Sequence, residues 1–522
     1  MSNKTTATTI AITKKNPKVR FPPEPNGYLH IGHLRSLYYN KLYADRNNGT
    51  LLLRFDDANP DNCKYEYVNA IIDDMKSMHF DMDSIPTSTM SQYFDICIGH
   101  IEKLLSKDLA YVETLDQETI QKLKTQKTNS ESRSNTTVRN IELWNSMKLG
   151  NSSGCVVRLK IDMNSGDGTM RDPIVYKVVA NANHYKTGDK YKVYPLFDFI
   201  SPLVDHFDGI THIFRTNEFQ GKEKLHKWIL NAFGYPIPKY KTFGRFNFEY
   251  TTLSKRNIRK IIDMNEKFNW SHPVIPTVRG VLNRGIHPKA LENYFSKYGV
   301  SKAGAIVAWD NLFKLNRNYL DRNVNKLFCV NPNNSYKVQI LCGLTVRPVI
   351  GDSNKDCMIG KEGDMVWNPK NKELGSRKVT FPSIVLIDKK DYELFKEGDK
   401  VFLIHYGPFI FNEGSLKFDT TFESIKDYPH KVSWVDANPL HHKTVVCEEY
   451  EHILNVREIT GSHQFEECVN KNPIKSYKLI IDNVDIKDGE TYQFMRNGYY
   501  KRYGDIYVYV REPPGTAQYL KY

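Results

Sequence analysis

Two histidines three residues apart lie at a turn that is suited to binding an anion. His30 and His33 follow an apolar segment that begins at Val19, and three prolines between residues 22 and 25 interrupt that segment. The prolines prevent it from continuing as a central strand, and apolar residues recur with helical spacing from His33 onward. A helix N-terminus here would offer free N–H groups to an anion beside the histidines. A proline-rich turn capping an ordinary strand would explain the prolines, but not the paired histidines.

A carboxylate is expected beside the histidines. Thr50 to Phe55 predict an apolar strand, and Asp56 follows its last residue directly. Ligands of open α/β sheets bind beyond the carboxyl ends of the strands, so Asp56 should face the same crevice as His30 and His33. The alternative is an aspartate that caps a helix before a turn.

Two cations complete the set of candidate groups. Arg215 ends a predicted strand over 209–215, and a guanidinium there suits a carboxylate ligand, because it can form two charge-assisted hydrogen bonds. A structural ion pair with Asp205 or Glu218 is the alternative. Lys255 lies in a Ser-Lys-Arg triplet, a sequence that by itself also fits a solvated surface.

The elements that must position these groups alternate between strands and helices. Helices are predicted over 68–78 and 94–109, between apolar strands, which is typical of a parallel, doubly wound sheet. The pattern changes near residue 112, where a charged helical stretch leads into a polar segment, 127–137, that we expect to be an exposed loop. Residues 155–161 then alternate like a half-buried strand. Because the first pattern returns at 194, we interpret residues 112–193 as an insertion.

The last third of the chain is rich in short strands. Residues 265–325 look helical, and from about 331 apolar runs are separated by Gly and Asp turns. This pattern is typical of β-barrels, with an unrelated sandwich as the alternative. Strands are predicted at 336–349, 379–388, 401–411, 443–454, 476–484 and 505–510.

Length and composition bound the remaining possibilities. A chain of 522 residues is too long for one core and predicts roughly three to five domains. No apolar stretch approaches the length of a membrane span, and the first eighteen residues lack the apolar run of a secretory signal. Their basic, acid-free composition leaves an organellar presequence open, although the proline motif begins soon after. The net charge of +13 favours a polyanionic partner.

The cysteines point to a reducing compartment. The eight cysteines include no Cys-x-x-Cys pair, which argues against a zinc knuckle and against a disulfide framework.

The proline motif carries a resemblance to a known family. Residues 22–33, Pro-Pro-Glu-Pro-Asn-Gly-Tyr-Leu-His-Ile-Gly-His, resemble the first ATP-binding motif of class I aminoacyl-tRNA synthetases, in the form used by the glutamyl and glutaminyl enzymes. Residues 54–60 resemble the family segment whose first aspartate lies near the amino acid. Residues 254–256 resemble the second motif, although Asn257 replaces a basic residue that the family usually carries. The family's Asp-Asp-Pro-Arg is also absent at 271–274, which is Ser-His-Pro-Val.

The resemblance implies an α/β architecture with several added parts. Residues 157–163 and 168–173 resemble the acceptor-end-binding insertion, and the strand-rich region resembles the two anticodon-reading β-barrels of archaeal and eukaryotic glutamyl and of glutaminyl enzymes. The implied domains are an N-terminal tail (1–17), the first half of a Rossmann-like, parallel-sheet catalytic domain (18–111), the insertion (112–193), the second catalytic half with the Ser-Lys-Arg loop (194–264), a helical connecting domain (265–330) and two β-barrels (331–522).

The same resemblance implies an ATP-dependent ligase. The amino-acid carboxylate would attack the α-phosphorus of ATP, and the terminal adenosine of tRNA would then take the acyl group. The catalytic residues would be His30, His33 and Lys255. The ATP-binding residues would be Glu24, Pro25, Asn26, His30, Ile31, Gly32, His33, Arg35, Ser36, Thr216, Arg245, Phe246, Leu253, Ser254 and Lys255. The amino-acid-binding residues would be Arg20, Glu24, Asp56, Phe197, Ser201 and Arg215.

Partners and cofactors follow from this reaction. We expect ATP with Mg²⁺, a tRNA bound at its acceptor end and anticodon, and L-glutamate. We expect no metal held by the protein alone, no DNA or membrane partner, a monomer and a cytoplasmic location.

The choice between glutamate and glutamine rests on mixed signals. Residues 25–26 and 218–220 look more like the glutaminyl enzyme, whereas 190–195, 201–202 and Arg215 look more like the glutamyl one. Phe197 stands where both usually carry tyrosine. Arg215 favours glutamate, because the NH₂ group of glutamine would face a side chain that only donates hydrogen bonds. The alternatives are a glutaminyl enzyme and, more remotely, a non-catalytic tRNA-binding paralogue, which would be expected to lose His30, His33 or Lys255.

Overall fold

The computed structural model describes residues 16–152, 154–297, 304–342, 358–461 and 463–513. These residues form two compact units. The first takes in the described residues of Met1–Phe246 and Phe295–Ala305, and the second takes in those of Asn247–Tyr294 and Ile306–Tyr522.

The first unit is built on parallel strands, as predicted. Strands β1 (Lys18–Phe21), β2 (Thr50–Phe55) and β3 (Thr87–Thr89) pair in parallel, and so do β8 (His212–Thr216) and β9 (Lys239–Phe243). The Thr211 N–H donates to the Lys18 carbonyl over 2.9 Å and joins β1 to the start of β8. Every residue of β2 after Thr50 is buried, as expected for a parallel strand that is covered on both faces.

Helices connect these strands. Most predicted elements are present with shifted ends; for example, the helix expected over 94–109 ends at Ser106. The helices are α1 (Ile31–Arg46), α2 (Tyr65–Ser77), α3 (Phe94–Ser106), α6 (Phe197–Phe207) and α7 (Glu223–Ala232), with single 3₁₀ turns at η1 (Met90–Tyr93) and η4 (Asn217–Lys222).

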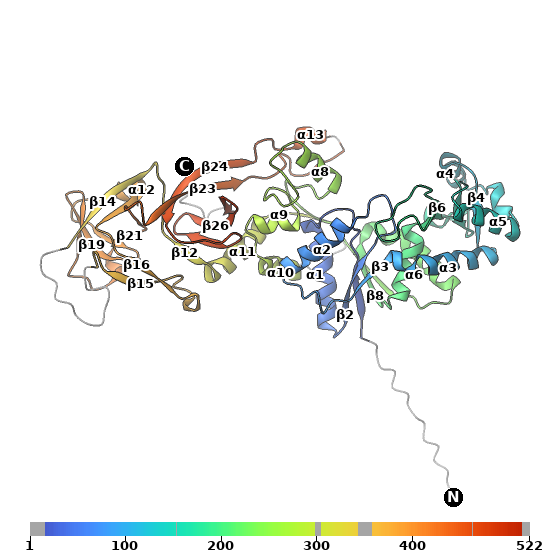
Figure 1. The fold of residues 1–522 in the computed structure, drawn as a ribbon, viewed down its shortest axis with the longest axis horizontal. Coiled ribbons are helices and arrows are strands. Elements are labelled where there is room, and N and C mark those ends of the chain that lie inside the picture. Colours follow the sequence, from blue (N-terminus) through green and yellow to red (C-terminus); the bar gives the residue numbers. More distant parts are fainter. Residues whose placement is uncertain (1–15, 153, 298–303, 343–357, 462, 514–522) are drawn as a thin grey trace, which may run out of the picture. The chain divides into compact units, whose positions relative to one another are not determined.

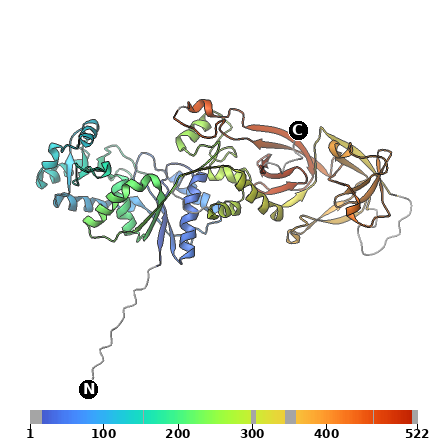
Figure 2. The same ribbon diagram turned by 180° about the vertical axis from the view of Figure 1, so that it is seen from behind.

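A separate antiparallel sheet interrupts the parallel strands. Strands β4 (Ala110–Glu113), β5 (Val156–Leu159), β6 (Ile174–Val178) and β7 (Val193–Pro195) pair in that order. Helices α4 (Gln117–Gln126) and α5 (Thr137–Lys148) lie beside this sheet (Figures 1 and 2). The polar segment expected to be an exposed loop is partly buried, because Ser130 and Ser132 at η2 (Glu131–Ser134) pack inward.

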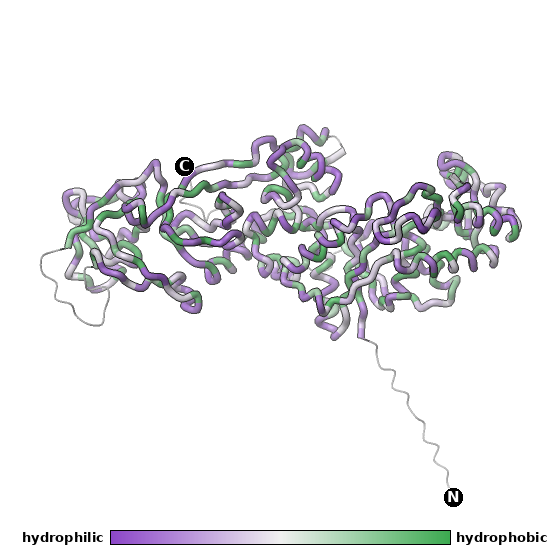
Figure 3. The backbone as a smooth tube through the Cα atoms, in the orientation of Figure 1, coloured by the Kyte–Doolittle hydropathy of each residue, from purple (hydrophilic) through white to green (hydrophobic). Residues whose placement is uncertain are grey.

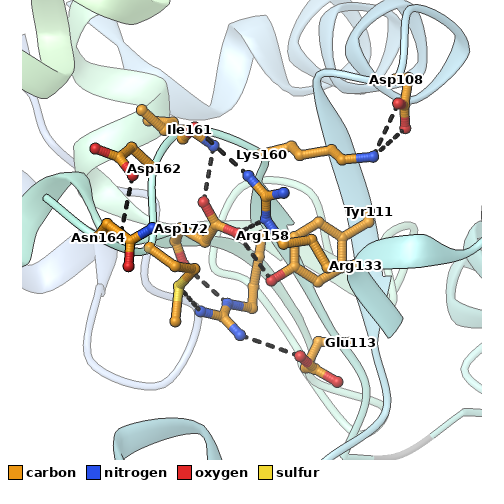
Figure 4. Close-up of polar contacts among 11 residues, drawn as sticks. Asp108, Tyr111, Glu113, Arg133, Arg158, Lys160, Ile161, Asp162, Asn164 and Asp172 are labelled. Carbon is orange, nitrogen blue, oxygen red and sulfur yellow. Dashed lines mark hydrogen bonds and ion pairs between the residues drawn. The ribbon is translucent and has the colours of Figure 1, made fainter. Parts of the chain in front are cut away.

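Buried charges hold the antiparallel sheet together (Figure 4). The Asp172 carboxylate accepts hydrogen bonds from Arg133 Nε at 2.7 Å and from the Tyr111 hydroxyl at 3.2 Å. Arg158 donates to the Asp172 carbonyl at 2.8 Å and forms an ion pair with Glu113 at 3.0 Å. Arg158 and Glu113 are both fully buried. The cluster therefore links β4 and β5 to the segment before β6 through charges that are all compensated.

The second unit begins with helices, as predicted. They are α8 (Lys255–Asp263), α9 (Val278–Asn283), α10 (Pro288–Lys297, which extends into the first unit's segment) and α11 (Asp310–Asn323), with short helices α12 (Lys389–Tyr392) and α13 (Phe465–Cys468) later in the chain.

Two seven-stranded sheets make up most of the second unit (Figure 1). A contiguous stretch forms the first sheet, in the order β21-β18-β19-β20-β14-β17-β22. The second sheet, in the order β12-β25-β26-β27-β23-β24-β13, takes its strands from both sides of that stretch. The strand-rich C-terminal part is thus confirmed, and it begins at Asn325 instead of near 331. Predicted residues 343–349 lie outside the described residues.

The strands of the first of these sheets are β14 (Ser335–Leu341), β17 (Ile384–Asp388), β18 (Lys400–Leu403), β19 (Gly407–Asn412), β20 (Ser415–Phe418), β21 (His430–Val432) and β22 (Val435–Asp436). Those of the second are β12 (Asn325–Leu327), β13 (Cys329–Val330), β23 (His442–Tyr450), β24 (Ile474–Asp482), β25 (Thr491–Phe494), β26 (Gly498–Tyr503) and β27 (Ile506–Val510). A hairpin, β15 (Glu362–Val366) with β16 (Ser376–Thr380), and two short strands, β10 (Phe246–Phe248) and β11 (Ala305–Val307), complete the set.

The hydropathy of the chain and the state of its cysteines can be described for the described residues. Hydrophobic residues are interspersed with hydrophilic ones along the chain (Figure 3), and none of the described helices is long and apolar enough to cross a bilayer. Cys342 is disulfide-bonded, so the expectation of reduced cysteines is wrong at this position. The free cysteines are Cys63, Cys97, Cys155, Cys329, Cys447 and Cys468.

The buried Arg158–Glu113 pair generates a stability prediction. We expect Glu113→Gln to lower the free energy of unfolding by about 3–5 kcal/mol, because it leaves the Arg158 charge buried without its partner. The matched control is Glu142→Gln, which breaks a largely exposed pair with Arg139 and should cost less than about 1 kcal/mol. Urea-induced unfolding of both variants measures the difference, and equal midpoints would contradict the assignment.

Candidate functional site

A cavity of about 630 Å³ lies at the carboxyl ends of the parallel strands in the first unit. Asp56, which follows β2, and Arg215, at the end of β8, both line it, as does His33 in the first turn of α1. Asp56 and His33 therefore share one crevice, as predicted, whereas His30, which was expected there too, is not among the lining residues. The lining residues are Arg20, Phe21, Pro22, Pro23, Glu24, His33, Ser36, Asp56, Ala58, Asn59, Pro60, Met90, Lys177, Tyr194, Pro195, Leu196, Phe197, Phe214, Arg215, Thr216, Phe219 and Phe243.

A buried carboxylate organises the charged wall of this cavity. Asp205 in α6 accepts hydrogen bonds from Arg20 Nε at 2.7 Å and Nη2 at 3.5 Å, and from Arg54 Nη1 at 2.6 Å. Arg54 Nε in turn donates to Asp56 at 2.8 Å. Burial by itself would raise the pKa of Asp205, but the charges of Arg20 and Arg54 hold it below its ordinary value. Two arginines and two aspartates thus balance one another.

Asp56 is the member of this network that is poised to titrate. Burial raises the pKa of the Asp56 carboxyl to about 6, and the neighbouring Arg54 opposes that rise. Arg20 retains one buried N–H group, Nη1, that has no hydrogen-bond partner within the described residues. This wall therefore contains a carboxyl group, Asp56, with a pKa close to neutral pH, and a buried guanidinium nitrogen, Arg20 Nη1, without a partner among the described residues.

Arg215 forms no ion pair with any carboxylate in the described part of the chain. Asp205 is engaged by Arg20 and Arg54, while Glu218 pairs with Arg245 at 2.5 Å and accepts from Thr216 at 2.8 Å. The structural ion pair left open as an alternative is therefore wrong.

The Arg215 side chain is nevertheless buried. Its exposed fraction is 8%, and its Nε and Nη2 atoms find no hydrogen-bond partner among the described residues. Its Nη1 lies 3.3 Å from His226 Nδ1, and the guanidinium packs on the Tyr240 ring at 4.8 Å. Burial, followed by the charge of Arg20, lowers the pKa of Arg215 from its ordinary value. A buried cation with two unused donors is the arrangement that an anionic ligand would compensate.

The paired histidines lie at the N-terminus of α1. His30 occupies the N-cap position, and its backbone N–H donates to His33 Nδ1 at 3.0 Å. The two rings stack with their centroids 3.7 Å apart. Because His33 Nδ1 accepts a hydrogen bond, the neutral His33 ring carries its proton on Nε2.

Other predicted site residues lie around the first motif without lining the cavity. Arg35 is buried, donates to the Gly244 carbonyl at 2.7 Å and packs against the Phe243 and Phe246 rings. Arg245 is largely exposed in its pair with Glu218. Of the residues expected to bind ATP or the amino acid, Glu24, Ser36, Thr216 and Phe197 line the cavity, whereas Pro25, Asn26, His30, Ile31, Gly32, Arg35, Ser201, Arg245 and Phe246 do not.

The second motif belongs to the other unit. Ser254 is the N-cap of α8, and its hydroxyl accepts from the Asn257 N–H at 3.4 Å. Lys255 is the first residue of that helix and Leu253 precedes the cap; both are half-buried. Asn257, where the sequence departs from the family pattern, also donates to Thr252 at 3.4 Å.

Several residues that line or support the cavity were not predicted from the sequence. Lys177 reaches the cavity from β6 of the antiparallel sheet, and Tyr194 comes from β7. Arg54 and His226 support the site from behind, although Arg54 lies in the motif that was recognised. No spacing signal connects Lys177 or His226 to the motifs, because their proximity depends on how distant segments pack.

The chain matches two family models. Residues 17–322 match the family model of the class I tRNA synthetase (E and Q) catalytic domain, and residues 350–426 match that of the anticodon-binding domain.

Similar curated proteins carry related names. A protein of Encephalitozoon cuniculi named "Probable glutamate--tRNA ligase, cytoplasmic" is 31% identical over 98% of this chain and 77% of its own length. "Glutamate--tRNA ligase, cytoplasmic" of Arabidopsis thaliana is 29% identical over 93% of this chain and 67% of its own. The mouse "Bifunctional glutamate/proline--tRNA ligase" is 30% identical over 92% of this chain, which spans only 32% of that protein's length.

A solved glutamate–tRNA synthetase from Elizabethkingia anophelis aligns with 59% of this chain and 71% of its own, at 20% identity and a TM-score of 0.44. The family assignment rests instead on the sequence matches, which cover more than half of the chain. The chain belongs to the class I tRNA synthetases of the glutamate and glutamine type.

Proposed function

We propose that this chain activates L-glutamate with ATP and transfers the glutamyl group to tRNA. The observation that carries the proposal is the buried guanidinium of Arg215, a residue of the cavity lining whose Nε and Nη2 atoms have no hydrogen-bond partner among the described residues. A side-chain carboxylate would satisfy both groups with charge-assisted hydrogen bonds. Glutamine offers an amide whose NH₂ group cannot accept, so it would leave the arginine charge uncompensated.

The rest of the amino acid would bind to the charged network around Asp205. Asp56 would pair with the substrate ammonium, and Arg20 Nη1 would donate to its α-carboxylate. Glu24, Phe197 and the buried Ser201 complete the proposed amino-acid set. In this arrangement the side-chain carboxylate of the substrate supplies the charge that the folded chain leaves unmatched at Arg215, which favours an amino acid with an acidic side chain.

ATP would lie against the first turn of α1. Helix N-terminal N–H groups and the His33 Nε2–H group are suited to phosphate oxygens, and Ser36 lines the same cavity. Lys255 would neutralise the departing pyrophosphate, as positioning and charge neutralisation dominate phosphoryl chemistry. The remaining residues proposed for ATP are Glu24, Pro25, Asn26, His30, Ile31, Gly32, Arg35, Thr216, Arg245, Phe246, Leu253 and Ser254.

Mg²⁺ would enter with ATP, as part of the substrate. No group of three or more His, Cys, Asp or Glu side chains among the described residues has the geometry to hold a metal ion. Mg²⁺ commonly keeps several waters and is held largely by substrate phosphates, which fits its entry with ATP.

The tRNA would span both units. The sheet β4–β7 and its helices are proposed to bind the acceptor end, and the two seven-stranded sheets to read the anticodon. The family match over 350–426 and the net charge of +13 support this assignment. The domain boundaries given from the sequence, a monomeric state and a cytoplasmic location, as in the names of the relatives, belong to the same proposal.

The motif lysine provides the first functional prediction. Lys255→Ala should slow glutamyl-adenylate formation by roughly 10²- to 10³-fold, the scale of losing one preorganised transition-state donor. The neighbouring Arg256→Ala is the control, since Arg256 is exposed in the same turn of α8. ATP–pyrophosphate exchange measures both. Near-normal exchange in Lys255→Ala would remove the catalytic role of this lysine.

Arg215 provides the second. The native protein should charge glutamate in preference to glutamine by roughly two to three orders of magnitude, because an unpaired buried charge costs about 3–5 kcal/mol. Arg215→Cys should largely abolish that preference. Competing charging with the two labelled amino acids tests both statements. Efficient glutamine charging by the native protein would overturn the glutamyl assignment, and an unchanged preference in the variant would remove only the role of Arg215.

The raised pKa of Asp56 predicts a pH dependence. Below about pH 6 the Asp56 carboxyl becomes protonated and can no longer pair with the ammonium of the amino acid. The KM for glutamate should therefore rise as the pH falls from 7 to 5. Asp56→Asn should have a high KM at pH 7 and a weaker pH dependence. Parallel profiles of the native and variant proteins would argue against this role.

A further inference from the structure

A buried histidine supports the Arg215 guanidinium from behind. His226 in α7 is fully buried, and its Nδ1 lies 3.3 Å from Arg215 Nη1. On the other side of the ring, Nε2 lies 3.8 Å from Asp198 Oδ1. The second oxygen of Asp198 pairs with Lys222 at 2.5 Å. The histidine therefore lies between a cation and a carboxylate that is itself held in place.

The chemistry of these groups fixes the state of the histidine. A guanidinium only donates hydrogen bonds, so Nδ1 must be unprotonated and the proton of the neutral ring must lie on Nε2, toward Asp198. Burial lowers the pKa of His226, and the charge of Arg215 lowers it further, against the opposing effect of Asp198. His226 is thus a neutral acceptor that orients Arg215 without compensating its charge.

Arg20 and Arg215 differ in which of their guanidinium nitrogen atoms have hydrogen-bond partners. Its Nε and Nη2 form a fork that holds the Asp205 carboxylate, and its Nη1 is the group left over. In Arg215 the pattern is reversed, since Nη1 contacts His226 while Nε and Nη2 have no partner among the described residues. Nε and Nη2 lie on one edge of the guanidinium plane, the edge that binds a carboxylate with two parallel hydrogen bonds.

We propose that His226 is a positioning residue for substrate selection, which holds Arg215 by Nη1 and so leaves its Nε–Nη2 edge without a protein partner, to receive the side-chain carboxylate of the amino acid. The proposal rests on the proposed function of Arg215 as the glutamate-binding residue. The Tyr240 ring covers one face of the guanidinium, so His226 fixes the remaining freedom, rotation within the plane. A carboxylate at position 226 would neutralise Arg215 and remove its preference for an acid, whereas a neutral acceptor preserves that preference.

Three substitutions of His226 separate positioning from simple core packing. His226→Asn keeps an oxygen acceptor near the place of Nδ1. His226→Gln is an amide of the same chemistry whose oxygen lies one bond further along the side chain. His226→Phe keeps the ring and removes both nitrogen atoms. The matched control is His100→Phe, a buried histidine of α3 in the same unit that contacts Tyr235 and does not line the cavity.

The expected result is a selective change in one kinetic constant. His226→Phe and His226→Gln should raise the KM for glutamate roughly tenfold or more, the scale of one lost hydrogen bond to a charged group, and should leave the KM for ATP unchanged. His226→Asn should stay within about threefold of the native protein, since it preserves that hydrogen bond. His100→Phe should alter neither KM. Steady-state aminoacylation measures these constants, and thermal melting reports whether each variant folds.

Several outcomes would overturn the proposal. It fails if His226→Phe leaves the KM for glutamate unchanged, or if the Asn and Gln variants change it equally. If His226→Phe does not fold, the comparison of the two amides decides alone. Arg215→Cys, measured alongside, distinguishes the two levels of the argument. If it raises the KM for glutamate while the His226 variants do not, only the role of His226 is lost. If it has no effect, the proposed role of Arg215 falls as well.

Discussion

The cavity depends on one buried carboxylate that receives two arginines. Arg20 and Arg54 lie on the adjacent parallel strands β1 and β2, so their positive charges would repel one another if Asp205 did not lie between them. Asp205 comes from α6, and the ion pairs therefore tie this helix to the ends of both strands. The first turn of α6 carries Phe197 and Asp198, so the same interaction also sets where the aromatic edge of the cavity and the support of His226 lie.

The network also explains why Arg215 can be kept apart from it. Arg20 and Arg54 are paired with Asp205 and Asp56, so the charges of this network balance, and Arg215 forms no ion pair with a carboxylate of the described residues. Burying an uncompensated cation costs free energy of folding. In the cavity wall this cost arises at Arg215, and an acidic ligand would reduce it. The preference for an acidic side chain then follows from the unpaired charge of Arg215.

The sequence predicts the frame of the site better than its inner surface. The proximity of Asp56 and His33 could be predicted, because ligands of open α/β sheets bind beyond the carboxyl ends of the strands. The partners of Asp205 could not be predicted, since Arg20 and Arg54 precede it by more than a hundred residues and its helix has several buried faces.

Arg35 was expected to bind ATP, but its position along the helix places it on the buried face. Arg35 follows Ile31 by four residues and so lies on the buried face of α1, where it packs against aromatic rings. His226 illustrates a different limit. Its tautomer and its contact with Arg215 depend on how distant segments pack, so neither could be predicted from the surrounding sequence.

The interleaved sheets of the second unit have a consequence for how the chain is made. Strands β12 and β13 pair with β25 and β24, so the earliest strands of one sheet must wait for partners that are more than 140 residues further along. The strands of the other sheet come from one contiguous stretch, β14 to β22, so each emerges from the ribosome soon after the strands with which it pairs. During synthesis the contiguous sheet can therefore form first, while β12 and β13 stay unpaired until β24 and β25 emerge.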